Sequence, residues 1–222
     1  MTRIRKVGII LMGGSGSRFG SSLPKQFHEI VNRKIYLHTL ETFQHSGLFD
    51  EIILVCHPDW IEEVKNEVSC PVVTGGSTRQ ESSYLGLIAC PQSTDYVVIH
   101  DAVRPFVSED ILKANIEAVQ VHKAVDTCIP ALDTPVISKN GTMIDTIPLR
   151  DHYWRGQTPQ SFAYELILQA HKKTLRKNVS DDCSLVLEMG HPVFFIHGSE
   201  ENIKITTEFD LILAQRLFLL KN

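Results

Sequence analysis

The residues best suited to chemistry form a glycine-rich loop near the start of the chain. Residues 13–20 read Gly-Gly-Ser-Gly-Ser-Arg-Phe-Gly, and Pro24-Lys25-Gln26 follows soon after. Glycines let backbone amides approach a ligand closely, and such a loop can surround phosphate oxygens. Arg18 and Lys25 add two positive charges. The loop therefore predicts a triphosphate site, since a plain glycine-rich turn would require neither cation.

Two familiar phosphate-binding loops do not fit this spacing. The dinucleotide fingerprint is G-x-G-x-x-G, but Gly14, Gly16 and Gly20 are spaced G-x-G-x-x-x-G. The Walker A loop ends in Gly-Lys-Ser or Gly-Lys-Thr, whereas Gly20 is followed by serine. The phosphate-binding hypothesis thus rests on the glycines together with the nearby cations.

A second glycine-containing segment spans residues 75–82. Its Gly-Gly pair precedes a predicted helix, and Ser77 with Gln80 predicts a capping box at the helix start. A helix N-terminus of this kind can bind an anion or a polar ligand. A well-capped helix without a ligand explains the same pattern.

Asp101 follows a predicted strand at residues 96–100. Ligands of open α/β sheets bind beyond the carboxyl ends of the strands, so Asp101 is placed to contact a metal, a ribose or a substrate hydroxyl. Magnesium prefers oxygen ligands and usually shares them with substrate phosphates. The alternative is an Asp101–Arg104 pair that only holds the loop.

Three later residues could hold phosphate. Thr134 and Arg150 lie at the two ends of a predicted hairpin, and a hydroxyl with a guanidinium suits a monophosphate. The alternative is that Thr134 and Arg150 are ordinary polar residues on the surface of the hairpin. Lys204 stands between two isoleucines, where a lysine is usually a surface residue with an extended stem.

The elements that position these residues alternate between strand and helix up to residue 129. This alternation predicts an α/β fold with a Rossmann-like, mostly parallel sheet and helices on both faces. Strands are expected at 6–12, 52–56, 72–73, 96–100 and 124–129, and helices at 35–45, 60–68, 77–89 and from Ser108 onward.

The pattern changes after Pro130. Residues 131–154 are expected to form a protruding β-hairpin arm with Asn140-Gly141 at its turn. An isolated hairpin is marginally stable, so a second subunit is its expected packing surface. The chain is expected to be one domain, residues 1–222, that carries this arm. Beyond it we expect a helix at 162–171, a helix between Ser180 and Gly190, a strand at 193–196 and a helix from Thr207.

Composition excludes several classes of protein. The 222 residues carry a net charge of −4, which gives no basic footprint for nucleic acid. The five cysteines form no C-x-x-C pair, which argues against a disulfide framework and a zinc site. Neither a signal peptide nor a membrane-length apolar run is visible. We therefore expect a cytoplasmic protein with no membrane or nucleic-acid partner.

The loop with Pro24-Lys25-Gln26 resembles the signature of the sugar-nucleotide pyrophosphorylase superfamily. It most resembles the cytidylyltransferases that act on methylerythritol phosphate or ribitol phosphate. Four later segments resemble the same family in the same order, namely residues 75–82, residues 100–105, the two ends of the hairpin and residues 202–206. The resemblance implies a nucleotidyltransferase fold, CTP and a polyol phosphate as substrates, and Mg²⁺ as cofactor. It also implies a homodimer in which the arm of one subunit reaches the site of the other.

The resemblance assigns a role to each matching residue. It implies that Arg18, Lys25 and Lys204 act on the reacting phosphates. The implied polyol phosphate contacts are Asp101, Arg104, Thr134 and Arg150, with Asp101 also near the metal. The implied nucleotide contacts are Met12, Gly13, Gly14, Ser15, Gly16, Gly76, Arg79, Ser82 and Ala102.

The sequence also bears on which polyol phosphate is the substrate. Residues 124–127 and 147–160 look closer to ribitol-5-phosphate cytidylyltransferases, which would supply CDP-ribitol for surface polymers of the cell wall. Residues 180–185 and Trp154 look closer to the methylerythritol phosphate enzymes of isoprenoid synthesis, which remain the alternative. A nucleotidyltransferase for a sugar 1-phosphate would leave the hairpin unexplained. A non-catalytic nucleotide-binding module would leave Lys25 and Lys204 unexplained.

Overall fold

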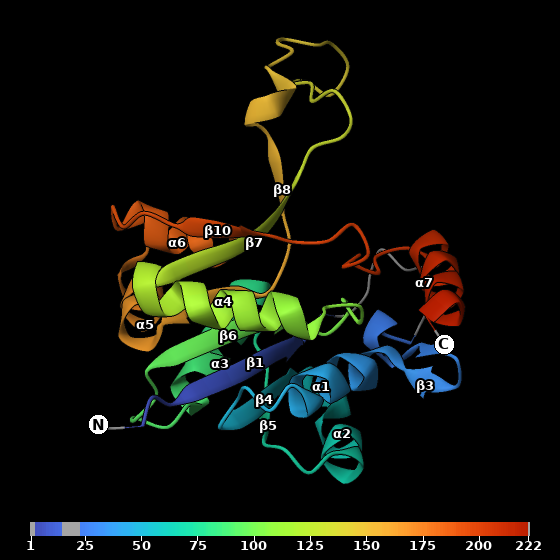
Figure 1. The fold of residues 1–222 in the computed structure, drawn as a ribbon, viewed down its shortest axis with the longest axis vertical. Helices are drawn as coiled ribbons and strands as arrows, with labels where there is room; N and C mark the ends of the chain where they lie inside the picture. The colour runs from blue at the N-terminus through green and yellow to red at the C-terminus, as the bar shows by residue number, and fades with distance from the viewer. Residues whose placement is uncertain (1–2, 15–22, 222) are drawn as a thin grey trace.

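One mixed β-sheet organises the chain, whose computed structural model describes residues 3–14 and 23–221. Its strands are β1 (Lys6–Met12), β4 (Glu51–Cys56), β5 (Val72–Thr74), β6 (Tyr96–Asp101), β7 (Ala124–Pro130), β8 (Trp154–Gly156), β9 (Gln160–Ala163) and β10 (Phe194–His197). The strand order is β10-β7-β9-β6-β1-β4-β5, with β8 also paired to β7. β1 runs parallel to β4 and β6, and β10 runs parallel to β7. The predicted mostly parallel α/β sheet is confirmed (Figure 1).

Helices cover both faces of this sheet, as the sequence predicted (Figure 1). One face packs against α3 (Arg79–Ala89), α5 (Tyr164–Lys173) and α6 (Cys183–Glu188). The other packs against α1 (Ile35–His45), α2 (Ile61–Glu67) and α4 (Glu109–His122). The remaining elements are the two-stranded sheet of β2 (Glu29–Ile30) and β3 (Arg33–Lys34), helix α7 (Glu208–Lys221) and short 3₁₀ turns at Lys25–Phe27, Pro58–Trp60 and Arg150–His152.

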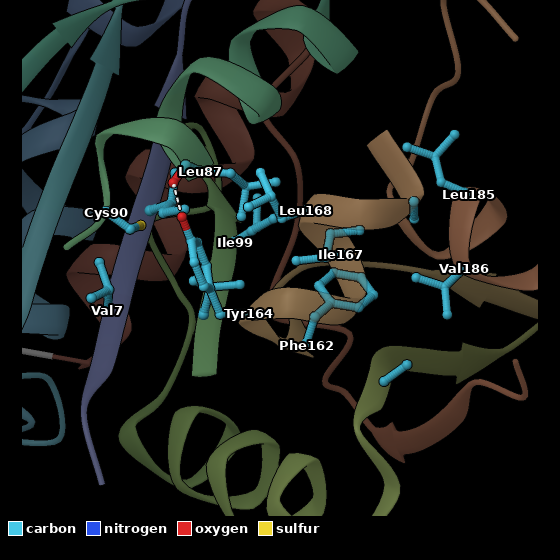
Figure 2. Packing of buried hydrophobic residues seen from close by; sticks show 14 of the residues in the cluster. Val7, Leu87, Cys90, Ile99, Phe162, Tyr164, Ile167, Leu168, Leu185 and Val186 are labelled. Atoms are coloured by element: carbon cyan, nitrogen blue, oxygen red, sulfur yellow. Dashed lines mark hydrogen bonds between the residues drawn. The ribbon is translucent and has the colours of Figure 1, made fainter. Parts of the chain in front are cut away.

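The central strand β1 shows why an uninterrupted apolar run becomes a buried parallel strand. Successive side chains of a strand point to opposite faces. Val7 and Ile9 enter the cluster beneath α3 and α5, which Figure 2 shows, whereas Ile10 and Met12 enter the cluster beneath α1 and α4. Both faces of β1 are therefore apolar. Gly8 is required here because a Cβ would lie 2.9 Å from the ring of Phe43.

The predicted helix at 162–171 is wrong in its first two residues. Residues 160–163 form β9, which runs antiparallel between β6 and β7, and helix α5 begins only at Tyr164. Phe162 is fully buried within this strand. The sequence concealed β9 because Gln160 and Ser161 are polar, although both are buried in the structure.

Two predicted helix starts are also shifted. Helix α3 is capped by Thr78, whose hydroxyl accepts a hydrogen bond from the Glu81 amide, so Ser77 and Gln80 are not the capping pair. Glu81 instead accepts hydrogen bonds from the amide and hydroxyl of Ser77. Helix α6 follows Asp182 and not Ser180. The predicted cap of α4 at Ser108 is confirmed.

Residues 131–154 leave the sheet after β7 and return in β8, and they form an arm that projects from the body (Figure 1). The predicted turn holds, because Gly141 has a φ of +74° and the Asn140 side chain accepts from two amides beyond it. The predicted strands do not form. Within the described arm a single bridge joins Ile137 to Thr146. Its exposed large apolar side chains are Leu132, Val136, Ile137, Met143, Ile144, Ile147, Leu149, Tyr153 and Trp154.

None of the helices among residues 3–14 and 23–221 is long and apolar enough to cross a membrane.

Candidate active site

A cavity of about 550 Å³ opens at the carboxyl ends of β1 and β6, where an open α/β sheet binds its ligands. We call it the first cavity. The sheet brings together segments that are far apart in the sequence, including the glycine loop, the start of α3 and the chain before α7. The predicted site residues that line it are Met12, Gly13, Gly14, Lys25, Gly76, Arg79, Ser82, Asp101 and Lys204.

The described part of the glycine loop is held by Gln26. Its side-chain amide donates hydrogen bonds to the carbonyl oxygens of Met12, at 2.8 Å, and Gly14, at 3.0 Å. A Cβ on Gly13 would lie 2.9 Å from the Ser82 hydroxyl, so glycine lets the loop lie against α3. The predicted residues Ser15, Gly16 and Arg18 lie outside the described residues.

The start of α3 forms another wall of the first cavity. The Ser82 hydroxyl accepts a hydrogen bond from the Gly76 amide at 3.1 Å, which ties the Gly-Gly turn to the helix. A Cβ on Gly76 would overlap the side chain of Glu81, so this turn also requires glycine. The positive end of the helix dipole favours anions here.

Asp101 lies at the centre of a group of three cations. Its carboxylate is 2.7 Å from Lys204 Nζ, 3.7 Å from Arg79 Nε and 3.9 Å from Arg104 Nε. Burial alone would raise the pKa of the Asp101 carboxyl, but Lys204 and the two arginines outweigh burial and hold that pKa well below its usual range. Asp101 is therefore ionised, and the group keeps a net positive charge.

Lys204 reaches this group because the residues on both sides of it are held by contacts with the body of the protein. Ile205 is fully buried and its amide donates to the Val103 carbonyl at 2.9 Å. Asn202, also fully buried, donates through its side chain to the Thr158 carbonyl at 2.8 Å. The sequence suggested a surface lysine as the simpler interpretation. The structure instead holds Lys204 at the cavity, with its side chain 35% exposed.

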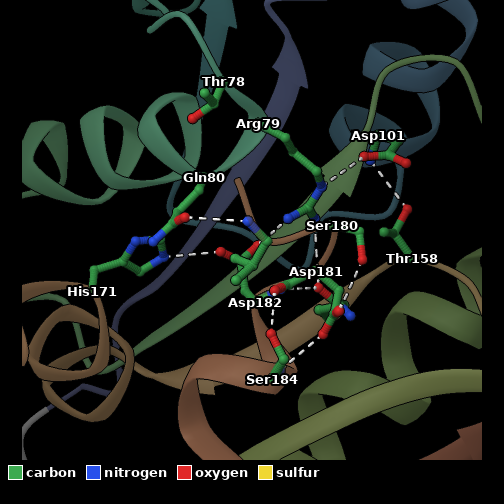
Figure 3. A network of polar contacts seen from close by, with 12 residues as sticks. Thr78, Arg79, Gln80, Asp101, Thr158, His171, Ser180, Asp181, Asp182 and Ser184 are labelled. Atoms are coloured by element: carbon green, nitrogen blue, oxygen red, sulfur yellow. Dashed lines mark hydrogen bonds and ion pairs between the residues drawn. The ribbon is translucent and has the colours of Figure 1, made fainter. Parts of the chain in front are cut away.

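Arg79 is shared between two carboxylates. Its Nη1 lies 2.8 Å from Asp182 Oδ2, and Asp182 also contacts His171 at 2.9 Å (Figure 3). Burial disfavours the charged guanidinium, but Asp182 and Asp101 outweigh burial and raise the pKa of Arg79 above its ordinary value. Arg79 therefore joins α3 to the chain before α6 and still lines the cavity.

A second cavity, of about 580 Å³, adjoins the first. The two share Arg79, Asp101, Ser180 and Lys204 in their linings. Away from these shared residues, the second cavity is lined by neutral polar and acidic side chains, by Arg104 and by an apolar part. The neutral polar and acidic residues are Asp126, Gln157, Thr158, Gln160, Asp181 and Ser184, and the apolar ones are Cys128, Cys183, Leu187, Val193 and Phe195. A ligand with an anionic end and a hydroxyl-rich chain would match this distribution of charge.

Arg104 and Ala102 make contacts within the fold that the resemblance did not imply. Arg104 lines the second cavity, and its Nη1 donates to the Asn202 carbonyl at 2.7 Å. Ala102 is fully buried and is absent from the described lining of either cavity. Its amide donates to the Leu11 carbonyl, and its carbonyl accepts from the Thr39 hydroxyl. Ala102 thus joins β6 to β1 and α1.

Thr134 and Arg150 belong to the projecting arm. Both are exposed, and Arg150 Nη1 donates to the Leu132 carbonyl at 3.3 Å. Figure 1 shows the arm extending away from the body of its own chain, so the structure does not bring these two residues to the cation group around Asp101.

Sequence reasoning missed several residues of the site. Thr158 accepts a hydrogen bond from the Asp101 amide at 3.1 Å (Figure 3). Gln160 lies beside Arg79 and accepts a hydrogen bond from the Asp182 amide. No helix or strand was predicted for residues 157–160, because the polar residues at the start of β9 give no strand pattern. Asp126 was noted only as part of a segment similar to ribitol enzymes.

The residues present suit Mg²⁺ only if a substrate supplies most of its ligands. No cluster of three or more His, Cys, Asp or Glu side chains among residues 3–14 and 23–221 could hold a metal ion. Asp101 is the carboxylate in the described lining of the first cavity, and the cations around it weaken its attraction for a metal. Magnesium commonly binds one carboxylate together with substrate phosphates, which fits this donor set.

Comparisons with known proteins agree with this geometry. Residues 7–221 match the family described as 2-C-methyl-D-erythritol 4-phosphate cytidylyltransferase. The chain is 38% identical to the ribitol-5-phosphate cytidylyltransferase of Lactiplantibacillus plantarum, over 94% of this chain and 96% of that protein.

Two solved structures are also similar to this chain in sequence and in fold. The 4-diphosphocytidyl-2C-methyl-D-erythritol synthase of Anaerococcus prevotii is 33% identical, with a TM-score of 0.87 over 97% of this chain and 96% of its own. The 2-C-methyl-D-erythritol 4-phosphate cytidylyltransferase of Thermus thermophilus is 29% identical, with a TM-score of 0.78 over 96% and 98% of the two chains.

Proposed function

Since this chain belongs to the 2-C-methyl-D-erythritol 4-phosphate cytidylyltransferase family, we propose that it transfers CMP from CTP to ribitol 5-phosphate. The products are CDP-ribitol and pyrophosphate. The alternative acceptor is 2-C-methyl-D-erythritol 4-phosphate, the substrate named for the family and for the two solved relatives. Ribitol 5-phosphate is favoured by the 38% identical relative that is named for it.

The observation that supports this proposal most directly is that the two cavities adjoin and share Arg79, Asp101 and Lys204 in their linings. A nucleoside triphosphate in the first cavity and a polyol phosphate in the second would bring their phosphates together at these cations. Such positioning supplies much of the catalysis when two reactants must meet.

The reaction forms one bond and breaks another at the α-phosphorus of CTP. An oxygen of the acceptor phosphate attacks that phosphorus, and the bond to the bridging oxygen of pyrophosphate breaks with its electron pair. The acceptor phosphate is already ionised near pH 8, so no general base is needed. Lys25 and Lys204 line the first cavity, where their ammonium groups would offset the charge of the transition state. Arg18 remains a predicted contact to the triphosphate.

Mg²⁺ is proposed as the metal that accompanies CTP, and Asp101 is the carboxylate of the first cavity that would help to hold it. Bound to phosphate oxygens, the ion would neutralise charge on the triphosphate and on the departing pyrophosphate.

A homodimer would complete the acceptor site. The arm exposes several large apolar side chains, a feature that supports a partner surface. The arm that carries Thr134 and Arg150 projects from the body of its own chain, so in the proposed dimer these two residues would bind the acceptor phosphate of the other subunit. The five free cysteines support a location in a reducing compartment, the cytoplasm.

Pyrophosphate release tests the proposal. CTP, UTP, GTP and ATP are each supplied with Mg²⁺ and one acceptor: ribitol 5-phosphate, 2-C-methyl-D-erythritol 4-phosphate or a sugar 1-phosphate. We expect CTP with ribitol 5-phosphate to give the highest kcat/KM. Release with a sugar 1-phosphate but with neither polyol phosphate would refute the proposed acceptor class.

A further inference from the structure

The second cavity contains a carboxylate that the reaction described above does not use. Asp126 belongs to β7 and lines this cavity together with Cys128, two residues further along the same strand face. β7 is paired with β9 on one side and β10 on the other, so the backbone that carries Asp126 is held on both sides. The carboxylate is therefore presented from a rigid element.

The two oxygens of this carboxylate have different partners. Oδ1 accepts hydrogen bonds from the Thr127 amide at 2.9 Å and the Gln160 side-chain amide at 3.1 Å. Oδ2 has only the Cys128 thiol, at 3.7 Å, among the hydrogen-bond donors of the described residues. A thiol is a weak donor, and a carboxylate oxygen can accept two hydrogen bonds. Oδ2 thus retains capacity for a ligand.

No described cation forms an ion pair with Asp126, although the charge of Arg104, in the same cavity, interacts with this carboxylate over a longer distance. The three cations of the site lie around Asp101, at the end of the second cavity that adjoins the first. Charge along the second cavity therefore changes from cationic at that end to anionic at Asp126. A polyol phosphate has the matching polarity, with an anionic phosphate at one end and hydroxyl donors along its chain.

From this geometry we propose that Asp126 recognises the acceptor by accepting hydrogen bonds, through Oδ2, from hydroxyl groups of its polyol chain. The inference rests on the proposed function and extends it, because it assigns acceptor selectivity to a residue of the chain's own second cavity. Gln160 acts with Asp126 as a positioning residue, since its side chain lies between Asp126 and Arg79.

Burial of this carboxylate is unfavourable in the empty protein. Burial is the main cause that raises the pKa of Asp126, to about 6. The group is thus mostly ionised at pH 8, at a cost to folding that a neutral amide of the same shape would not have. Replacing this carboxylate with a neutral amide should therefore not destabilise the folded protein, which the variant below tests.

The first test is the isosteric variant Asp126→Asn, assayed at pH 8 with CTP and ribitol 5-phosphate. A hydrogen bond to a charged carboxylate is stronger than one to a neutral amide. Because the variant loses this difference, its KM for ribitol 5-phosphate should rise by about tenfold. The KM for CTP is expected to stay within about twofold, because Asp126 does not line the first cavity. Equal KM values for ribitol 5-phosphate in variant and wild type would overturn the inference.

A melting temperature separates recognition from a structural role. Removing the buried charge should leave the melting temperature of Asp126→Asn equal to or above that of wild type. A lower melting temperature, with both KM values unchanged, would show a structural carboxylate and overturn the inference. Glu117→Gln, at an exposed position in the middle of α4, is the matched control for charge removal and should change neither the KM for ribitol 5-phosphate nor the melting temperature.

A second variant tests the space beside Oδ2. A Cβ on Gly156 would lie 3.4 Å from Oδ2. Gly156→Ala would therefore narrow the cavity at this oxygen, and we expect it too to raise the KM for ribitol 5-phosphate and not for CTP. An unchanged acceptor KM in this variant would count against a hydroxyl group bound at Oδ2.

Analogues of ribitol 5-phosphate that each lack one hydroxyl give the most specific readout. At least one analogue should have a raised KM with wild type, and this penalty should largely disappear with Asp126→Asn, as in a double-mutant cycle. Penalties that persist unchanged in the variant would overturn the inference. Failure of wild type to use either polyol phosphate would instead refute the proposed function, so the two failures are distinguishable.

Discussion

Asp101→Asn is the perturbation whose effect the structure predicts most fully. The substitution keeps the shape of the side chain but removes the negative charge that faces Lys204, Arg79 and Arg104. Arg79 retains its ion pair with Asp182, so Lys204 is the cation that loses the most electrostatic stabilisation. The expected result is a less stable substrate-free protein.

The size of the effect follows from distance and exposure. Two unit charges about 4 Å apart interact by about 4 kcal/mol at an effective dielectric constant of 20. Lys204 lies 2.7 Å from Asp101, but its side chain is 35% exposed. Because water screens exposed pairs, we reduce its contribution to about 2 kcal/mol. With the two arginines included, Asp101→Asn should lower the free energy of unfolding by about 3 kcal/mol.

The pH dependence has a definite sign. The folded protein lowers the pKa of the Asp101 carboxyl, so its stabilisation is complete above the unfolded pKa of about 3.9. That stabilisation is lost only as the pH falls through the lower, folded pKa. The difference between wild type and Asp101→Asn should therefore be constant from pH 5 to pH 8.

Urea unfolding at pH 5 and pH 8 measures this difference, with Glu117→Gln, at an exposed position in the middle of α4, as the control. Lys204→Met completes a double-mutant cycle, for which we expect a coupling energy of about 2 kcal/mol with Asp101. A destabilisation below about 1 kcal/mol, or a coupling near zero, would refute the view that the charge of Asp101 holds the cation group together.

Three further predictions concern catalysis, assembly and acid stability. Lys25→Ala should lower kcat for pyrophosphate release at least about 100-fold, as expected for a key electrostatic donor, and a kcat near wild type would exclude that role. If the arm acts in the other subunit, Lys25→Ala and Arg150→Ala should each be nearly inactive, but their co-expression should restore about a quarter of wild-type activity, since half of the dimers then hold one intact site. No recovery in co-purified mixed dimers would contradict the shared site. Burial lowers the pKa of His100 to about 4, so the unfolded chain binds the extra proton between pH 6.5 and 4 and stability should fall on acidification through that range. His100→Asn should reduce this fall in urea-unfolding measurements, and an equally steep fall in the variant would show that other groups cause it.

Local patterns in the sequence predicted most of the sheet because they depend on short-range physics. β1 is apolar on both faces, and its neighbours follow the same rule, so its position is readable from residues 6–12 alone. The antiparallel strand β9 was not readable. Gln160 and Ser161 are buried because their side chains bond to groups brought by distant segments, and such partners are not visible in a local window.

The candidate site shows the same division. Lys25 was identified from the glycine-rich loop that precedes it, and Asp101 from its place after a predicted strand. Both line the first cavity. Lys204 was identified only through a family resemblance, since its position depends on contacts made by its neighbours. Asp126 was overlooked as a site residue, because the apolar residues around it predict an ordinary buried strand and its cavity forms only when β7 and α6 come together.

The most direct test of the central claim is a competition in one vessel. Wild-type protein with CTP and Mg²⁺ is given equal concentrations of ribitol 5-phosphate and 2-C-methyl-D-erythritol 4-phosphate, and the two CDP-linked products are resolved by mass. We predict that CDP-ribitol forms first and in large excess, in step with pyrophosphate. An excess of the methylerythritol product would contradict the proposed acceptor, and pyrophosphate release without either product would contradict the account of the site as a polyol-phosphate cytidylyltransferase.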